Sequence, residues 1–201
     1  MKTLRIAALL APIALGACVA PPYVSRVEVT RFTGDEPQLL GTGPIAVIAP
    51  PGLDQDSLEA SVFQNAVANE LHQLGYIVTG DMAQQVAEVS VEQFVETAGH
   101  RNGSSVGVGV GGSSGGWYGS GGGVGVGVGL DLTPRPADRY TRELRVMIKP
   151  AAGGLALWEG RARFTASANS NMAQTDAAAA KLADALFAGF PGQSGETIEV
   201  E

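Results

Sequence analysis

Few side chains in this chain of 201 residues have the types and spacing that chemistry at a site requires. The run Gly107–Gly112 has the glycine spacing of a dinucleotide-binding fingerprint. That motif needs a helix opening at its last glycine to hold the pyrophosphate, and Ser113–Gly116 cannot form one. The two histidines, His72 and His100, lie far apart, and one cysteine cannot complete a zinc site. The sequence therefore predicts no cofactor-binding residue and no metal ligand.

Catalytic patterns are not found either. No serine occupies a nucleophile-elbow pattern. Glu88, Glu92 and Glu96 share one side of an alternating segment, which is typical of a solvated strand face rather than of catalytic acids. Arg161 and Arg163 lie opposite Glu143 in a predicted hairpin and are expected to form cross-strand charge pairs. The two arginines are also candidate contacts for a protein partner.

The one residue with predicted chemistry is Cys18, the only cysteine in the chain. Lys2 and Arg5 precede an apolar run, Ile6–Leu15, which is too short to span a bilayer and is typical of a signal peptide over residues 1–17. The run ends in Leu-Gly-Ala-Cys, which resembles the bacterial lipobox. By that resemblance Cys18 would carry a thioether-linked diacylglycerol and an amide-linked acyl chain. Two or more chains hold a protein stably at a membrane.

An ordinary signal peptide is the alternative, with cleavage after Ala20. Pro21 makes that bond a poor site, and a free thiol would be unusual in an exported protein. Val19, rather than Asp, follows the cysteine. By resemblance to enteric lipoproteins, this favours the periplasmic face of the outer membrane over the inner membrane.

Composition limits the partners. Removing Lys2 and Arg5 from the 13 basic residues leaves 11 against 20 acidic residues, a net charge of −9. Nucleic acid and anionic lipid surfaces both require clustered positive charge, so neither is an expected partner. An acylated Cys18 leaves no disulfide, and stability must come from a packed core.

Periodicity predicts both strands and helices. Ser25–Phe32 is a predicted first strand, and the apolar run Ile45–Ala49 predicts a strand buried on both faces. Asp56 and Glu59 form a capping-box pattern before a helix that ends at Gly75, and Tyr76–Val78 predicts a strand parallel to the previous one.

Alternation is clearest in the second half of the chain. Val86–Thr97 alternates, and a hairpin turns at Pro150–Gly154. The predicted inward residues of the hairpin are Tyr140, Leu144, Val146 and Ile148 in one arm and Trp158, Ala162, Phe164 and Ala166 in the other. A last helix is predicted over about Met172–Phe190.

These elements predict an α+β fold, a two-layer sandwich. A mixed, mostly antiparallel sheet of about six strands would carry two helices on one face. The predicted organisation is a lipidated tether over residues 18–24, one domain over residues 25–191 and a frayed acidic tail over residues 192–201.

Several motifs together resemble a family of uncharacterised Gram-negative lipoproteins, known as domain of unknown function 4136. In chain order they are the Leu74–Tyr76 helix end, a glycine-rich insert before the hairpin, Arg142–Ile148, Leu157–Gly160 and the Phe190-Pro191 pair. The resemblance implies a fold similar to the amino-terminal domain of TolB-like and curli-secretion-like lipoproteins. It implies a location and a fold but no activity.

A glycine-rich insert over residues 103–130 interrupts the domain. Its two arms, Val106–Gly111 and Gly123–Leu130, alternate valine with glycine around a linker that carries Trp117 and Tyr118. Three interpretations remain open. The insert is a flexible flap, a hairpin whose Trp117-Tyr118 tip meets a partner or membrane interface, or one hairpin of a shared pore. A membrane strand needs ~9–11 alternating residues, and these arms are shorter.

The function expected from the sequence is a non-enzymatic lipoprotein with a structural, assembly or adaptor role through protein contacts. The alternative is a subunit of an oligomeric secretion channel that uses the glycine insert. The sequence does not indicate the oligomeric state.

Overall fold

The computed structural model describes residues 20–53, 57–98 and 136–201. Pro21–Thr97 and Ala137–Glu201 form one compact unit. The predictions for the signal peptide, for Cys18, for His100 and for the insert with Trp117 and Tyr118 fall outside the described residues.

A mixed seven-stranded sheet with two helices forms this unit, so the predicted α+β class is confirmed, with one strand more than expected in the described part. Its order is β3-β2-β4-β5-β6-β1-β7. The strands are β1 (Val27–Thr33), β2 (Pro44–Ile48), β3 (Ile77–Val78), β4 (Gln85–Glu96), β5 (Arg139–Pro150), β6 (Trp158–Ser167) and β7 (Thr197–Val200). β2 is parallel to β3 and β4, as predicted for β3, and the other pairs are antiparallel.

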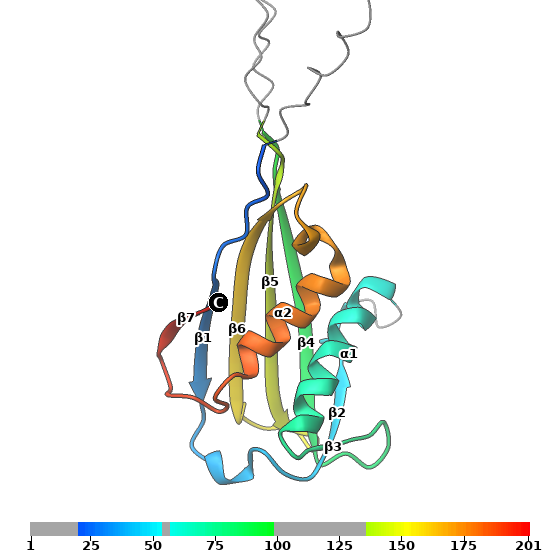
Figure 1. Cartoon of the computed structure of the whole chain (residues 1–201). Coiled ribbons are helices and arrows are strands. Elements are labelled where there is room, and N and C mark those ends of the chain that lie inside the picture. The colour runs from blue at the N-terminus through cyan, green and yellow to red at the C-terminus, as the bar shows by residue number, and fades with distance from the viewer. Residues whose placement is uncertain (1–19, 54–56, 99–135) are drawn as a thin grey trace, which may run out of the picture. The chain divides into compact units, whose positions relative to one another are not determined.

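Both α-helices pack on one face of the sheet and against each other (Figure 1). Helix α1 spans Leu58–Gln73 and α2 spans Thr175–Phe187, while short 3-10 turns occupy Pro37–Leu39 (η1) and Asn171–Ala173 (η2). The N-cap of α1 is Ser57, whose side chain accepts a hydrogen bond from Ala60 N at 3.4 Å. The predicted cap at Asp56 is therefore wrong by one residue. Gly75 ends α1 with a φ of 100°, as its position after the helix predicted.

Helix α2 is shorter than predicted at both ends. Its first residues by prediction form η2, and the chain leaves the helix at Ala188, followed by Gly189 with a φ of 74°. Ala178, Ala179, Leu182, Ala183 and Leu186 form its buried stripe. Such small and straight-chain residues favour helix and let α2 lie close to the sheet.

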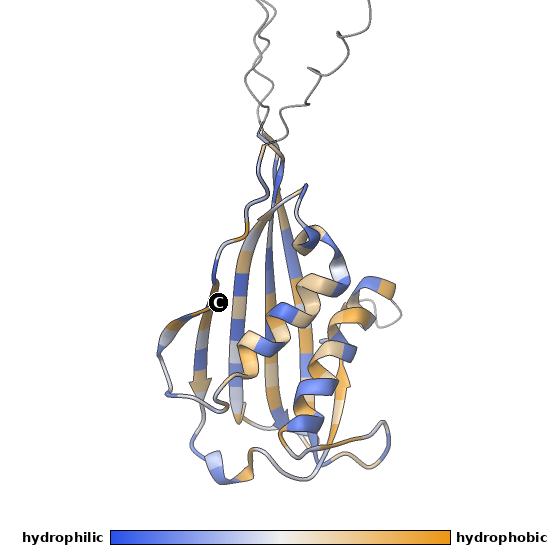
Figure 2. Ribbon diagram, in the orientation of Figure 1, coloured by the Kyte–Doolittle hydropathy of each residue, from blue (hydrophilic) through white to orange (hydrophobic). Residues whose placement is uncertain are grey.

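The core lies between the sheet and the helices. The predicted inward residues Leu144, Val146, Ile148, Trp158, Ala162, Phe164 and Ala166 are buried there. Figure 2 shows the corresponding bands of hydrophobic and hydrophilic residues along β5 and β6. Trp158 is fully buried, stacks on Phe187 at 5.5 Å between ring centroids and donates from Nε1 to Pro191 O at 2.9 Å. Gly160 leaves room for that indole ring, since a Cβ there would lie 2.2 Å from Trp158 Cη2.

Two arginines are buried on the helix-covered face. Arg31 on β1 donates to Leu186 O (3.0 Å), Ala185 O (3.1 Å) and Ala188 O (2.8 Å), the carbonyls at the C-terminal end of α2. Arg142 on β5 donates to Gln93 Oε1 at 2.7 Å and to the carbonyls of η2. Burial lowers the pKa of both guanidinium groups from its usual value. The two arginines therefore fix the two ends of the α2 region to the sheet.

Two predictions about strands are wrong. β2 is not buried on both faces, because Ile48 is 37% exposed and only the two-residue β3 lies beyond it. The tail is not frayed throughout, because Thr197–Val200 pair with β1 as β7. Thr30 Oγ1 and Thr197 Oγ1, 2.8 Å apart, add a side-chain hydrogen bond to that ladder.

Candidate partner-binding face

The sheet face opposite the helices is the candidate site. No described helix covers it, and the alternating outward residues of β1, β5 and β6 lie on it (Figure 1). These outward residues are mostly charged or carry hydroxyl groups: Glu28, Thr30, Thr141, Glu143, Arg145, Lys149, Glu159, Arg161, Arg163 and Thr165. We call this surface the open face.

Charge pairs organise the open face. The Glu143 carboxylate forms ion pairs with Arg145 at 3.0 Å and with Arg161 at 3.2 Å, and its side chain is only 15% exposed. The sequence also paired Arg163 with Glu143, which lies opposite it on β5. Arg163 instead contacts Glu28 on β1, its neighbour on the other side, at 3.0 Å. That prediction is therefore right for Arg161 and wrong for Arg163.

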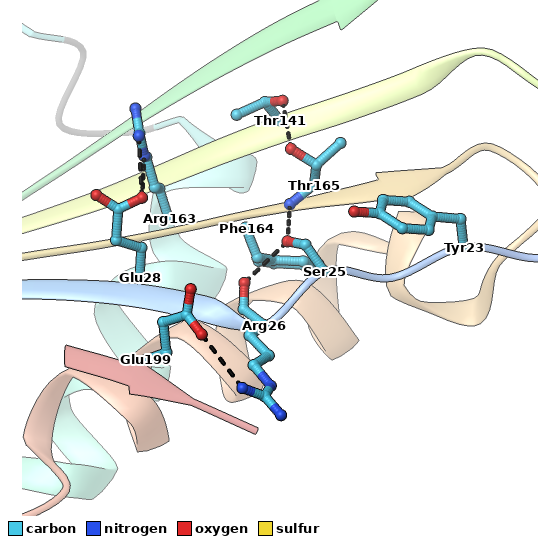
Figure 3. A pocket seen from close by; sticks show the side chains of 9 residues that line it. All are labelled: Tyr23, Ser25, Arg26, Glu28, Thr141, Arg163, Phe164, Thr165 and Glu199. Atoms are coloured by element: carbon cyan, nitrogen blue, oxygen red, sulfur yellow. Dashed lines mark hydrogen bonds and ion pairs between the residues drawn. The ribbon is translucent and has the colours of Figure 1, made fainter.

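A shallow groove of about 520 Å³ lies where β1, β5, β6 and β7 meet on this face. Figure 3 shows its lining: Tyr23, Ser25, Arg26, Glu28, Thr141, Arg163, Phe164, Thr165 and Glu199. Ser25 Oγ accepts from Thr165 N at 2.9 Å, and the Thr141 and Thr165 hydroxyls lie 2.8 Å apart. Arg26 reaches Glu199 at 3.2 Å. The charged groups can exchange their partners for those of a peptide at little cost, because exposed ion pairs are weak.

A family comparison now identifies the domain. The family described as "Domain of unknown function (DUF4136)" matches residues 46–192, well over half of the chain. The chain belongs to this family.

The match places the groove at the border of the DUF4136 region. Thr141, Arg163 and Thr165 come from β5 and β6, inside the matched residues. The other side of the groove comes from β1, from the residues before it and from β7, outside the match. The match begins at residue 46, after β1.

A curated relative and solved structures are also similar in part. An uncharacterised protein of Zymomonas mobilis is 50% identical over 46 residues, which are 23% of this chain and 17% of the relative. The chain thus spans about a sixth of the length of that relative. Two PelC dodecamer structures from Paraburkholderia phytofirmans have TM-scores of 0.42 and 0.43 at 12% and 11% identity, over 82% and 86% of this chain and 95% and 100% of theirs. A PDZ domain protein from Parabacteroides distasonis has a TM-score of 0.48 at 15% identity, over 89% of this chain and 38% of its own.

Two further titratable groups, His72 and Glu70, belong to α1 and lie apart from the open face. His72 is exposed on α1. In the described residues no three His, Cys, Asp or Glu side chains gather where they could hold a metal, and no helix there is long and apolar enough to cross a bilayer.

A second groove of about 250 Å³ lies between α1 and α2, and Glu70 is among the residues that line it. Burial, followed by the nearby charge of Asp184, raises the pKa of the Glu70 carboxyl, while a hydrogen bond from Gln73 lowers it.

Of the candidate contacts from the sequence, the structure describes Arg161 and Arg163 and places both on the open face. Sequence reasoning missed Tyr23 and Ser25, which were assigned to the tether or to the first strand. Their role depends on the antiparallel pairing of Val24 with Ala166, a contact between distant segments. The apolar–polar alternation begins only at Arg26-Val27, so no local pattern extends the strand region back to Tyr23 and Val24.

Proposed function

We propose that this DUF4136 protein is a triacylated lipoprotein of the outer membrane, facing the periplasm, with a non-enzymatic adaptor or assembly role. The lipobox at Leu15–Cys18 and the contacts of Tyr23 carry this proposal. Tyr23 N donates to Ser167 Oγ at 2.8 Å, so the chain is attached to the domain five residues after Cys18. A lipid on Cys18 would therefore hold the domain close to the membrane.

The open face supports the adaptor role. It presents the Arg161 and Arg163 side chains, each about half exposed and paired with Glu143 and Glu28, beside a groove lined by hydroxyl groups. Arginine is enriched in protein interfaces because its planar guanidinium can form several directed hydrogen bonds. A partner with an acidic, extended segment would meet Arg161, Arg163 and Arg26 there.

Lipidation is tested by mass spectrometry of the protein extracted from Gram-negative cells. The expected N-terminal peptide starts at Cys18 and carries three acyl chains. In membrane fractionation the protein is expected in the outer-membrane fraction. Cys18→Ser is expected to abolish both results. A mature chain that starts at Pro21 with no lipid would refute the anchor.

The adaptor role is tested by crosslinking in cells. A photoreactive phenylalanine derivative replaces Arg161 or Arg163 in separate variants, and the control replaces Gln73, which is exposed on α1. The expected result is a discrete adduct with an envelope protein from position 163 and none from position 73. Absence of an adduct from both 161 and 163 would refute a partner on the open face.

The second candidate function is a subunit of an oligomeric secretion channel. The alternating valine and glycine of Val106–Gly111 and Gly123–Leu130 favour it. Light scattering of the lipidated protein in mild detergent, with and without residues 103–130, separates the two proposals. A ring that dissociates on deletion is expected for the channel, and a monomer in both forms would refute it.

A further inference from the structure

One end of the sheet gathers segments that are far apart in the sequence. Glu96 at the end of β4 lies opposite Arg139 at the start of β5, and Arg139 lies opposite Ser167 at the end of β6. Ser167 Oγ binds the backbone of Tyr23. Figure 1 shows β4, β5 and the segment before β1 converging there. The segment before β1, the end of β4 and the start of β5 therefore lie at the same end of the sheet.

Exposed apolar side chains surround this end. Tyr23 is 46% exposed, Val24 38%, Phe94 57% and Val95 52%. Val95 lies opposite Tyr140, Tyr140 lies opposite Ala166, and Ala166 lies opposite Val24, so these residues form one row across the end of the sheet. We call these side chains, Tyr23, Val24, Phe94, Val95 and Tyr140, the tip.

The tip has the chemistry of a membrane interface. Two of its side chains are tyrosines, which have an apolar ring and a polar hydroxyl, and such residues concentrate where lipid meets water. The Arg139 guanidinium lies 5.1 Å from the centroid of the Tyr23 ring. Arginine in that position can reach lipid phosphates while its stem and the ring remain in apolar surroundings.

Distance distinguishes the tip from the opposite end of the sheet. Five extended residues reach at most about 18 Å, so an acylated Cys18 keeps Tyr23 within that distance of the lipid head groups. The twelve residues of β5 extend about 36 Å away from the tip. The opposite end also exposes apolar side chains, Leu155 at 85% and Met82 at 95%, but these are aliphatic and lie beyond the reach of the tether when the strands point away from the membrane.

We propose that the tip rests in the head-group layer of the bilayer that holds Cys18, with the long strands pointing away from the membrane. This inference depends on the lipidation proposed above. The bilayer is the occupant that the tether brings to the tip at high effective concentration. In this orientation the open face stands clear of the membrane, where a periplasmic partner can reach it.

The test uses the full acylated chain in proteoliposomes of phosphatidylethanolamine and phosphatidylglycerol. Lipid blocks the only natural cysteine, so one engineered cysteine is the only thiol available for a fluorescent label. Phe94→Cys and Val95→Cys report on the tip, and Leu155→Cys is the matched control at the other end. Quenching by lipids brominated near the head group reports contact with the bilayer.

The expected result is loss of about half of the fluorescence at positions 94 and 95, with little loss at 155, because interfacial groups lie about 5–10 Å into the head-group boundary. Equal, weak quenching at all three positions would overturn the inference. Loss of fluorescence at the tip that disappears when labelled protein is diluted with unlabelled protein would also overturn the inference. Such a loss comes from quenching between two labels and would indicate a second copy as the occupant.

Mass spectrometry of the same sample separates the two proposals. If Cys18 carries lipid and the tip is not quenched, only the orientation is refuted. If Cys18 carries no lipid, both the anchor and the orientation fail. Circular dichroism of each labelled variant confirms that the domain is folded, and Val95→Cys provides a second measurement if Phe94→Cys is not.

Discussion

The buried guanidinium of Arg31 allows a quantitative test of how α2 is held to the sheet. The last carbonyls of a helix have no partners within the helix and carry the negative end of its dipole. Arg31 donates to three carbonyls at this end, at 2.8 to 3.1 Å. Arg31→Met fills similar space but leaves these buried carbonyls without a donor.

The size of the effect follows from those bonds. Each hydrogen bond from a charged donor contributes about 1.5 kcal/mol, and three would contribute about 4.5 kcal/mol. The cost of burying the charge, visible in the lowered pKa of Arg31, offsets part of this. We therefore expect Arg31→Met to lower the free energy of unfolding by about 3 kcal/mol, equivalent to a fall in Tm of roughly 6–12 °C. Arg31→Lys retains the charge without the forked geometry and is expected to lose about half as much.

The assay is urea unfolding followed by circular dichroism, on a chain that starts at Val19 so that no lipid is present. Arg26→Met is the matched control. Arg26 is also close to β1, but its side chain is 62% exposed in its ion pair with Glu199, and its loss is expected to change stability by less than about 1 kcal/mol. If Arg31→Met is no more destabilising than Arg26→Met, the proposed role of Arg31 is wrong.

Three more predictions use the same unfolding assay. The pKa of Glu70 is raised by burial and by Asp184, so the ionised carboxylate destabilises the folded state above that pKa. Glu70→Gln should therefore raise the free energy of unfolding at pH 7 by under about 1 kcal/mol. The gain should vanish as the pH falls to the pKa of Glu70 in the unfolded state. A gain that persists in acid would contradict this. Gly160→Ala places a methyl group against Trp158 and should cost about 1–3 kcal/mol and alter the near-ultraviolet circular dichroism; an unchanged spectrum would argue against the contact. Deleting residues 196–201 removes β7 and should cost about 1–2 kcal/mol; no loss would mean that the β7 pairing contributes nothing.

Alternation in the sequence predicted the buried faces of β5 and β6 because one residue in two must face the helices. The same pattern held a signal for the buried arginines. Arg31 is in phase with Val27 and Val29, and Arg142 is in phase with Leu144. Arginine is rarely buried without partners, and its partners here are helix carbonyls that only the tertiary fold brings close. A charged residue in phase with an apolar stripe is therefore an indication of such a contact.

The errors at the strands and on the open face have a related cause. Thr197–Val200 alternates, but its pairing with β1 joins the two ends of the domain and no local pattern specifies it. The partner of Arg163 depends in the same way on the register of β1 against β6. Long-range register is fixed by the hydrophobic pattern of the whole sheet rather than by neighbouring residues. The candidate groove could not be predicted because it lies where these long-range pairs meet.

The connection between β4 and β5 gives the last prediction. Glu96 and Arg139 are paired, so residues 97–138 close a loop whose ends the sheet already holds together. Replacing residues 98–137 with Asn-Gly leaves a four-residue connection, about ten times shorter, and keeps Asp138, whose backbone O accepts a hydrogen bond from Ala168 N at 2.7 Å. It should raise the free energy of unfolding by about 2 kcal/mol, because each doubling of loop length costs about 0.6 kcal/mol. Urea unfolding again measures the change, and a turn with Asn-Gly suits the antiparallel strands that it joins. A loss of stability instead would contradict the flexible-flap interpretation, because it would require the removed residues to contribute contacts to the domain. An increase would establish that the shortened chain is folded, which the comparison of oligomeric states with and without residues 103–130 requires.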